Sequence, residues 1–421
     1  MIYCNIQILI KNKAIHNFTN RQTDISVCLT NLQKLIFKSA QKKLNLKNVK
    51  FRNMASRFVY RKTPDFPNRY VSPEKLFIYL QTNFSDHIKE VGRSSLDKPI
   101  FKMTLGTGRT KILAWSQMHG NESNATHALL DLLESLKNQP EMRENLLSKI
   151  TLDFILMLNP DGSEKWTRRN ALDIDMNRDF LKLSSKEFRL LKEITDNGQY
   201  DYALNLHEQR TIFTTDGHHP ATLAFLAPSQ DHTWEITETR KKAMAVISKI
   251  YGNLKVELPN QIARYSDEFY PTSTGDNFTK MGIPTILYEG GHFPDDYKRE
   301  GTRKYYTMAL YEGLKAISDL RGSTENWELY KEIPENKETH YDVIYRNVKL
   351  NTDFECILDI AVQYKEEILD GEDEITFVPI VVEVGDIGRK KGWKEIDCTG
   401  KSFVSEKKFP KLDGEVDFKI E

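Results

Sequence analysis

Hydrophobic and polar positions alternate regularly along the chain from about residue 70, and the pattern predicts strands and helices in turn. Apolar runs at 152–158 (LDFILML) and 283–288 (IPTILY) have the length of strands covered on both faces. Residues 124–136 repeat apolar side chains at the helical period. The expected strands are 99–105, 111–117, 152–158, 202–206, 223–227 and 283–288, and the expected helices are 72–83, 124–136, 185–197, 234–250 and 303–320.

Alternating strands and helices predict an α/β fold with a mixed, mostly parallel central sheet and helices on both of its faces. After about residue 322 the pattern changes, because β-branched and polar residues alternate at 343–360 and 374–384. We therefore expect an α/β domain at 54–321 and a small β-rich C-terminal domain at 322–421.

Composition and charge narrow the class of protein. The chain has 421 residues, with 39% hydrophobic and 29% charged residues, as soluble globular proteins do. Its 60 basic and 60 acidic residues give no net charge, so we expect no nucleic-acid partner. No apolar run approaches the ~20 residues of a membrane helix, and we expect no membrane partner.

The first 53 residues differ from the rest, with ten Lys or Arg and one acid, Asp24. We expect 1–53 to be a disordered or non-native extension, and a targeting peptide is the alternative. Cysteines are too sparse for a disulfide framework, and we expect a reducing, cytoplasmic location. The four cysteines are Cys4, Cys28, Cys356 and Cys398.

Polar side chains directly follow several expected strands. His119 and Glu122 come after 111–117, His207 comes after 202–206, and Glu289 comes after 283–288. An Asn-Pro-Asp-Gly sequence follows 152–158. Because sites in α/β sheets lie beyond the carboxyl ends of strands, we expect these side chains to meet.

His119, Glu122 and His207 form a set of two imidazoles and one carboxylate. This is the ligand set of a catalytic zinc site, which keeps its fourth position for water. A single His-x-x-Glu is a weak signal, and the strand-end His207 is what strengthens it. We expect one Zn²⁺ per chain. Other conceivable ligands are His218, His219, His232 and His292.

The order of motifs from 70 to 320 resembles the zinc carboxypeptidase family of carboxypeptidases A and B. The motifs are His-x-x-Glu, Asn-Pro-Asp-Gly, Arg-x-Asn, Asp-x-Asn-Arg, a strand-end His and a late Glu. The resemblance implies a hydrolase in which His119, Glu122 and His207 bind zinc. It also implies that Glu289 is the general base.

The same resemblance assigns residues to the substrate. Arg168 would stabilise the transition state, with Arg169 as the alternative, and Asn177 and Arg178 would hold the terminal carboxylate. Asp175 would accept a hydrogen bond from a zinc-bound histidine and fix its orientation.

Two further residues follow from the family pattern. Tyr270 is the candidate for a tyrosine that covers the substrate, and Tyr265 is the alternative. Gly275 would line the specificity pocket, so that the sequence indicates no preference between apolar and basic C-terminal residues.

Two other functions remain open. The His-Gly-Asn-Glu sequence at 119–122 and the Asp-x-Asn-Arg-x-Phe sequence at 175–180 also resemble succinylglutamate desuccinylase and aspartoacylase, which have a β-rich C-terminal domain. We therefore expect a peptide, or alternatively an N-acyl amino acid, with a free carboxylate as substrate. A non-catalytic binding protein is the third reading, and the sequence does not indicate an oligomeric state.

Overall fold

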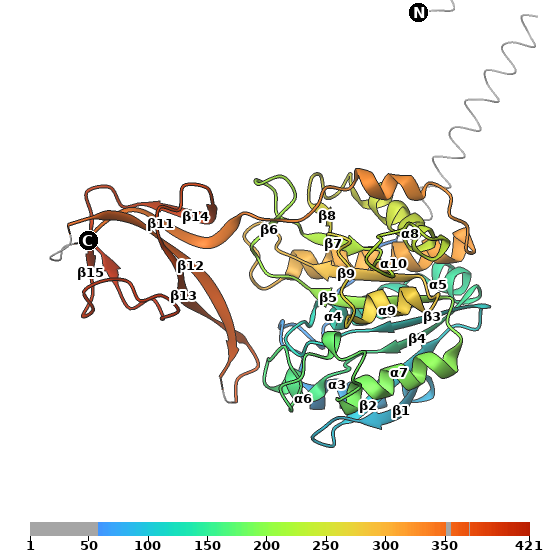
Figure 1. Cartoon of the computed structure of the whole chain (residues 1–421). Coiled ribbons are helices and arrows are strands. Elements are labelled where there is room, and N and C mark those ends of the chain that lie inside the picture. The colour runs from blue at the N-terminus through green and yellow to red at the C-terminus, as the bar shows by residue number, and fades with distance from the viewer. Residues whose placement is uncertain (1–57, 351–354, 370) are drawn as a thin grey trace, which may run out of the picture. The chain divides into compact units, whose positions relative to one another are not determined.

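The computed structural model describes residues 58–350, 355–369 and 371–421. These residues form an eight-stranded mixed sheet with helices on both faces, and a β-rich C-terminal region (Figure 1). The fold class is the one that the sequence predicts. The expectation for 1–53 lies outside the described residues, and the domain boundary at 321/322 stays a prediction.

The centre of the large sheet is parallel, and antiparallel strands flank it. β4, β3, β5 and β9 are parallel neighbours, while β2 pairs antiparallel with β4 and β7 pairs antiparallel with β9. Across the sheet the order is β1 (Ile88–Arg93), β2 (Pro99–Leu105), β4 (Ile150–Ile155), β3 (Thr110–Trp115), β5 (Tyr202–Glu208), β9 (Thr285–Gly290), β7 (Leu223–Leu226) and β8 (Ile262–Arg264).

Side chains of the central strands point alternately into two hydrophobic cores, as the pleat of a strand requires. In β3, Ile112 and Ala114 belong to the core with α4, α8 and α10, whereas Leu113 and Trp115 belong to the core with α7 and α9. The helices of this region are α3 (Pro73–Asn83), α4 (Asn124–Lys137), α5 (Pro140–Leu147), α6 (Pro160–Glu164), α7 (Lys186–Gly198), α8 (Glu238–Leu254), α9 (Thr274–Lys280) and α10 (Glu300–Leu320).

Capping residues define where several of these helices begin. Ser72 caps α3 and Ser185 caps α7, close to the predicted starts. The predicted start of α8 at 234 is wrong by four residues. Trp234 has a φ of 55°, which a right-handed helix excludes, and Thr237 is the actual cap. The sequence patterns missed β1, β8, α5 and α9, which are short.

The C-terminal region forms its own sheet with its own small core around Val348, Ile360 and Phe403. A two-stranded ribbon, β6 (Phe213–Thr214) with β10 (Lys337–Glu338), connects this region to the segment after β5. The strands of the C-terminal sheet are β11 (His340–Leu350), β12 (Ile357–Ile368), β13 (Ile375–Gly385), β14 (Lys391–Asp397), β15 (Ser402–Val404) and β16 (Lys419–Ile420).

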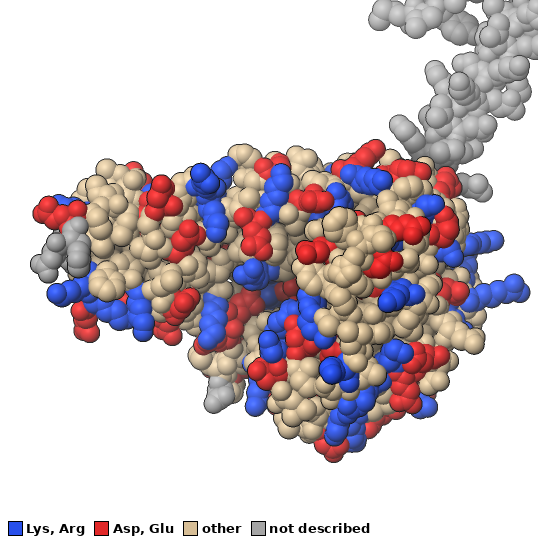
Figure 2. All heavy atoms as spheres, viewed as in Figure 1, with Lys and Arg blue, Asp and Glu red and all other residues tan. Residues whose placement is uncertain are grey.

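The surface shows no separation of charge on the face seen in Figure 2, where basic and acidic side chains are interspersed. This agrees with the absence of net charge in the sequence. Among the described residues, no helix combines the length and the apolar character needed to cross a membrane.

Candidate metal and substrate site

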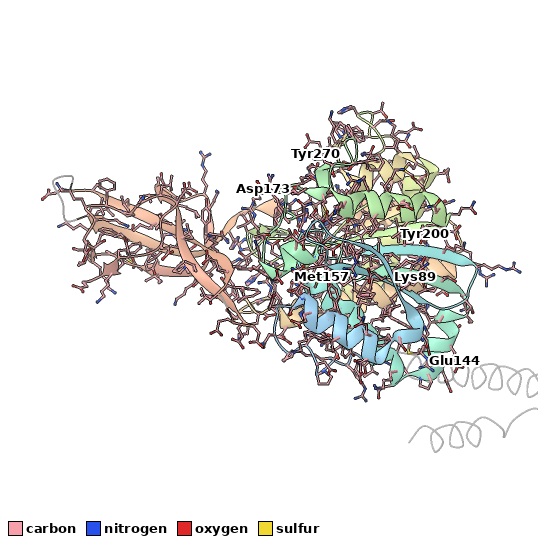
Figure 3. All side chains as sticks on the ribbon, turned by 90° about the horizontal axis from the view of Figure 1, so that it is seen from below. Lys89, Glu144, Met157, Asp173, Tyr200 and Tyr270 are labelled. Atoms are coloured by element: carbon pink, nitrogen blue, oxygen red, sulfur yellow. The ribbon has the colours of Figure 1, made fainter. Side chains whose placement is uncertain are left out.

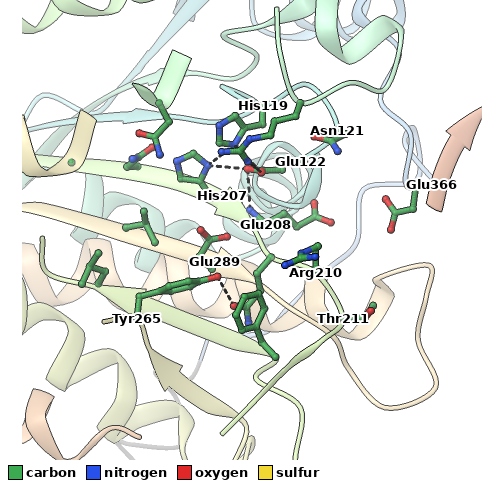
Figure 4. Close-up of a pocket in the computed structure, with 18 of the residues that line it drawn as sticks. His119, Asn121, Glu122, His207, Glu208, Arg210, Thr211, Tyr265, Glu289 and Glu366 are labelled. Carbon is green, nitrogen blue, oxygen red and sulfur yellow. Dashed lines mark hydrogen bonds and ion pairs between the residues drawn. The ribbon is translucent and has the colours of Figure 1, made fainter. Parts of the chain in front are cut away.

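The predicted ligands and the predicted base meet at the carboxyl ends of three neighbouring strands. β3, β5 and β9 are adjacent and parallel, so the segments that follow them leave the same edge of the sheet. His207 and Glu289 occupy paired positions on β5 and β9. His119 and Glu122 lie between β3 and α4 and face His207 (Figure 4).

Glu122 lies between the two histidines. Its Oε1 is 2.8 Å from Nδ1 of His119, and its Oε2 is 2.8 Å from Nδ1 of His207. One ligand atom from each of the three buried residues lies within 4.8 Å of the others. Two imidazole nitrogens and a carboxylate oxygen that converge in this way fit a zinc ion.

Asp175 holds the ring of His119 from the other side. Its Oδ1 lies 3.2 Å from Nε2 of His119, and its Oδ2 accepts a hydrogen bond of 3.1 Å from Nε of Arg168. Burial would raise the pKa of Asp175, but the bond to His119 and the charge of Arg168 outweigh it and lower that pKa. Such a carboxylate fixes the ring and leaves Nδ1 free for a metal.

Glu289 lines the site, and one of its carboxylate oxygens is left without a protein partner among the described residues. Its Oε2 is buried and has no hydrogen-bond partner among the described residues. Burial raises the pKa of Glu289 well above the ordinary value, and the charge of Glu122 adds to this effect. A carboxylate with a raised pKa and a free oxygen can accept a proton.

Arg168, and not Arg169, reaches the predicted ligands. Its Nη1 is 3.1 Å from Nδ1 of His119 and 3.4 Å from Oε1 of Glu122. The Arg169 guanidinium instead contacts Asp173, four residues along. The structure therefore places the Arg168 cation beside the predicted metal ligands.

A cavity of about 750 Å³ connects these groups with the predicted substrate residues. Arg178 lies in its wall with its guanidinium 5.2 Å from the ring centre of Tyr270, and donates to the carbonyl of Asn177. Within the described part of the chain, Arg178 has no ion pair with a carboxylate. It is therefore a cation available to an anionic ligand.

Both candidate tyrosines line this cavity, in different settings. Tyr270 is 46% exposed and lies on the loop that precedes α9 (Figure 3). Tyr265 is half-buried, and its hydroxyl donates to Oε1 of Gln209. The exposed position suits a side chain that moves over a substrate, as predicted for Tyr270.

Comparisons with known proteins find similar sequences and structures. Residues 74–275 match the family model described as zinc carboxypeptidase. This part of the α/β region is therefore similar to zinc carboxypeptidases. Carboxypeptidase 2 of Trichophyton tonsurans is 30% identical over 118 residues, which are 28% of this chain and 20% of the relative. Carboxypeptidase 2 of Trichophyton rubrum is 33% identical over 100 residues, 23% of this chain and 19% of the relative. The chain thus spans about a fifth of these curated relatives.

Solved structures of the same kind are also similar. A metallo-carboxypeptidase from Burkholderia cenocepacia is 17% identical, with 60% of this chain and 70% of that chain covered and a TM-score of 0.47. Bovine thrombin-activatable fibrinolysis inhibitor is 12% identical, with 63% of this chain and 98% of that chain covered and a TM-score of 0.48.

Asn205 and Asp276 also line the cavity, and the sequence patterns missed both. Both amide atoms of Asn205 and Oδ1 of Asp276 are buried without a partner among the described residues. Burial raises the pKa of Asp276 to about 6. Asn205 lies two residues before His207 on β5, and this period-2 relation was the available signal.

The other four histidines that the sequence offers as conceivable ligands lie in other surroundings. His219 pairs with Asp216, His218 contacts Lys391, and His232 packs on an aromatic ring. His292 packs against the rings of Tyr297 and Trp393. Within the described residues, the group of side chains that could hold a metal ion consists of His119, Glu122 and His207, and it includes none of these four.

Proposed function

We propose that this chain is a zinc metallocarboxypeptidase that hydrolyses the C-terminal peptide bond of its substrate. The observation that carries the proposal is that one cavity contains the three converging donors, the free oxygen of Glu289 and the unpaired cation of Arg178. When bound, zinc polarises the scissile carbonyl and makes water acidic enough to lose a proton near neutral pH.

Glu289 handles the proton in this proposal. Its free Oε2 takes the proton from the attacking water, holds it, and gives it to the nitrogen of the leaving amino acid. The raised pKa of Glu289 suits both steps, because the group must accept a proton and then release it. Cleavage thus produces a shortened peptide and one free amino acid.

Two arginines have separate roles. Arg168 lies beside the ligands, where its N–H groups can stabilise the negative charge that develops on the carbonyl oxygen. Arg178 has no ion pair with a carboxylate of the described residues, and its planar guanidinium suits bidentate binding of the substrate's terminal carboxylate. Asn177 adjoins Arg178 and lines the same cavity, where its amide contributes to that binding.

The lining of the cavity suggests which kind of side chain the removed residue carries. Leu226 and Leu287 provide apolar surface there, while Asn205 and Asp276 present buried polar atoms without partners. Unpaired buried acceptors favour a ligand with hydrogen-bond donors. We therefore expect a C-terminal residue with a donor-bearing side chain, such as Lys or Arg, to be preferred over Leu.

A panel of substrates tests the function. We expect release of the C-terminal amino acid from peptides with a free carboxylate, loss of this activity with a chelator, and recovery with zinc. The same peptides with a C-terminal amide should be poor substrates, because they lack the charge that Arg178 binds. Hydrolysis of N-acyl amino acids without peptide cleavage would favour the amidohydrolase alternative. Zinc binding with no turnover of either class would favour the non-catalytic binding protein.

A further inference from the structure

Side chains of the C-terminal region reach the cavity that contains the metal ligands. Residues 363–366 of β12 line it together with His119 and His207. Figure 4 shows Glu366 across the cavity from Glu122. The C-terminal region therefore contributes to the wall of the site.

Hydrogen bonds attach the C-terminal region close to the ligand His207. Gln363 donates to Oγ1 of Thr211 at 2.7 Å, and the indole of Trp393 donates to the carbonyl of Thr211 at 2.9 Å. Thr211 is four residues after His207. These contacts hold the β12 wall next to the end of β5.

Two ion pairs and a hydrogen bond then connect Glu366 to Glu122, one of the predicted metal ligands. Nη1 of Arg69 lies 2.5 Å from Oε1 of Glu366, and its Nη2 lies 2.5 Å from Oε1 of Glu208. The backbone N–H of Glu208 donates to Oε2 of Glu122 at 3.2 Å. Glu366 is therefore separated from a predicted metal ligand by Arg69 and Glu208.

Arg69 is inside the protein, where its charge needs partners. Its side chain is 6% exposed and that of Glu208 is 3% exposed, so neither has much contact with water. Glu208 uses its second oxygen to accept the N–H of Asn124, at the start of α4. The carbonyl of Arg69 accepts the hydroxyl of Ser123, next to Glu122. Arg69 thus joins the segments that carry Glu122 and His207.

We propose that Glu366 is a positioning residue, through which the C-terminal region fixes the geometry of the metal ligands. By holding one end of Arg69, Glu366 sets where Arg69 holds Glu208, and Glu208 in turn orients Glu122. Partners of metal ligands usually affect metal affinity about 10–100-fold. The expected effect on catalysis rests on the proposed function, whereas the zinc affinity can be measured whether or not the protein is a peptidase.

The test is the zinc affinity of Glu366→Gln, measured by competition with a chromophoric chelator. Glutamine keeps the shape but removes the charge that holds Arg69. We expect zinc binding to weaken about 10-fold or more and kcat to fall, with little change in KM. Glu395→Gln is the matched control, because Glu395 pairs with Arg346 inside the C-terminal sheet. It should leave zinc affinity unchanged.

The outcomes separate the possibilities. Zinc affinity of Glu366→Gln within twofold of the unsubstituted protein would overturn the proposal, as would an equal loss in Glu395→Gln. If Glu366→Gln does not fold, Arg69→Lys replaces it, since lysine keeps the charge but cannot hold both carboxylates with separate nitrogens. Normal zinc affinity in Arg69→Lys would then overturn the proposal. Failure of peptide hydrolysis in the unsubstituted protein would reject the proposed function alone.

Discussion

At the scale of single residues, Glu122 shows how the site keeps a charge inside the protein. Burial alone would raise the pKa of Glu122, but the neighbouring His119 and His207 outweigh it and lower that pKa. The carboxylate therefore stays ionised and available to a cation. Glu289 lines the same cavity, but burial and the charge of Glu122 raise its pKa. The pKa values of these two carboxylates are thus shifted in opposite directions, which suits Glu122 to binding a cation and Glu289 to accepting a proton.

Replacement of Glu289 by glutamine should separate binding from chemistry. Glu289→Gln keeps the volume of the side chain but cannot accept a proton, so kcat should fall by about 10³-fold or more. Zinc content by metal analysis should be unchanged, because Glu289 is not among the three converging donors. Turnover at the original rate would remove Glu289 from the mechanism.

The Arg178 cation should act on substrate binding. In Arg178→Gln we expect KM to rise about 30–100-fold for peptides with a free carboxylate, since a charged bidentate contact of about 2–3 kcal/mol is lost. Amidated peptides should respond little to the same change. Arg169→Gln is the control, because Arg169 contacts Asp173 and not the ligands. An equal effect of both substitutions would argue against the assignment.

At the scale of elements, the start of α7 holds the segment that carries Arg178. Asp179 is buried and accepts the backbone N–H groups of Ser184 and Ser185 as well as the hydroxyl of Ser185. The same hydroxyl caps α7 by accepting the N–H of Phe188. Helix capping and placement of the Arg178 loop therefore depend on one serine.

Ser185→Ala tests this arrangement. We expect the free energy of unfolding to fall by about 1–2 kcal/mol, because a buried cap and a hydrogen bond to a carboxylate are lost together. Ser72→Ala removes the cap of α3, whose bond is exposed and 3.5 Å long, and should cost less. Denaturant unfolding of both variants measures the difference. A loss in Ser185→Ala no larger than that in Ser72→Ala would contradict this account.

At the scale of the whole molecule, two buried histidines lie where the C-terminal region meets the α/β region. Trp393 stacks on His340 with ring centres 4.1 Å apart and also contacts His292 at 5.1 Å. Burial lowers the pKa of His292 to about 3 and that of His340 to about 4, and the cations of Arg299 and Lys391 contribute respectively. Both rings are therefore neutral in the folded protein.

These histidines should make stability depend on pH. The unfolded chain takes up protons below about pH 6.5 while the folded protein does not, so stability is full above that pH and falls as the pH drops towards 4. The slope is at most ~1.4 kcal/mol per pH unit for each histidine. Thermal unfolding between pH 7.5 and 4.5, followed by tryptophan fluorescence, measures it. The variant His292→Asn/His340→Gln should flatten the slope, and His87→Gln, at an exposed position, should not.

The sequence by itself determined the longer elements and which three metal-binding side chains would lie close together. Repeats of apolar side chains every 2 or 3.6 residues depend only on neighbours in the chain. Strands such as 202–206 and helices such as 124–136 could therefore be predicted from the sequence. The convergence of His119, Glu122 and His207 could be predicted because the carboxyl ends of parallel strands lie at one edge of the sheet. Short elements such as α9 were missed, since seven residues carry too little pattern.

Tertiary structure alone decided the contacts between distant segments. The pairing of His207 with Glu289 depends on the register of β5 against β9, and no local pattern encodes it. The ion pairs of Arg69 join residues that are 139 and 297 positions away. Burial of a charge, and therefore its need for a partner, arises only when separate segments exclude water together.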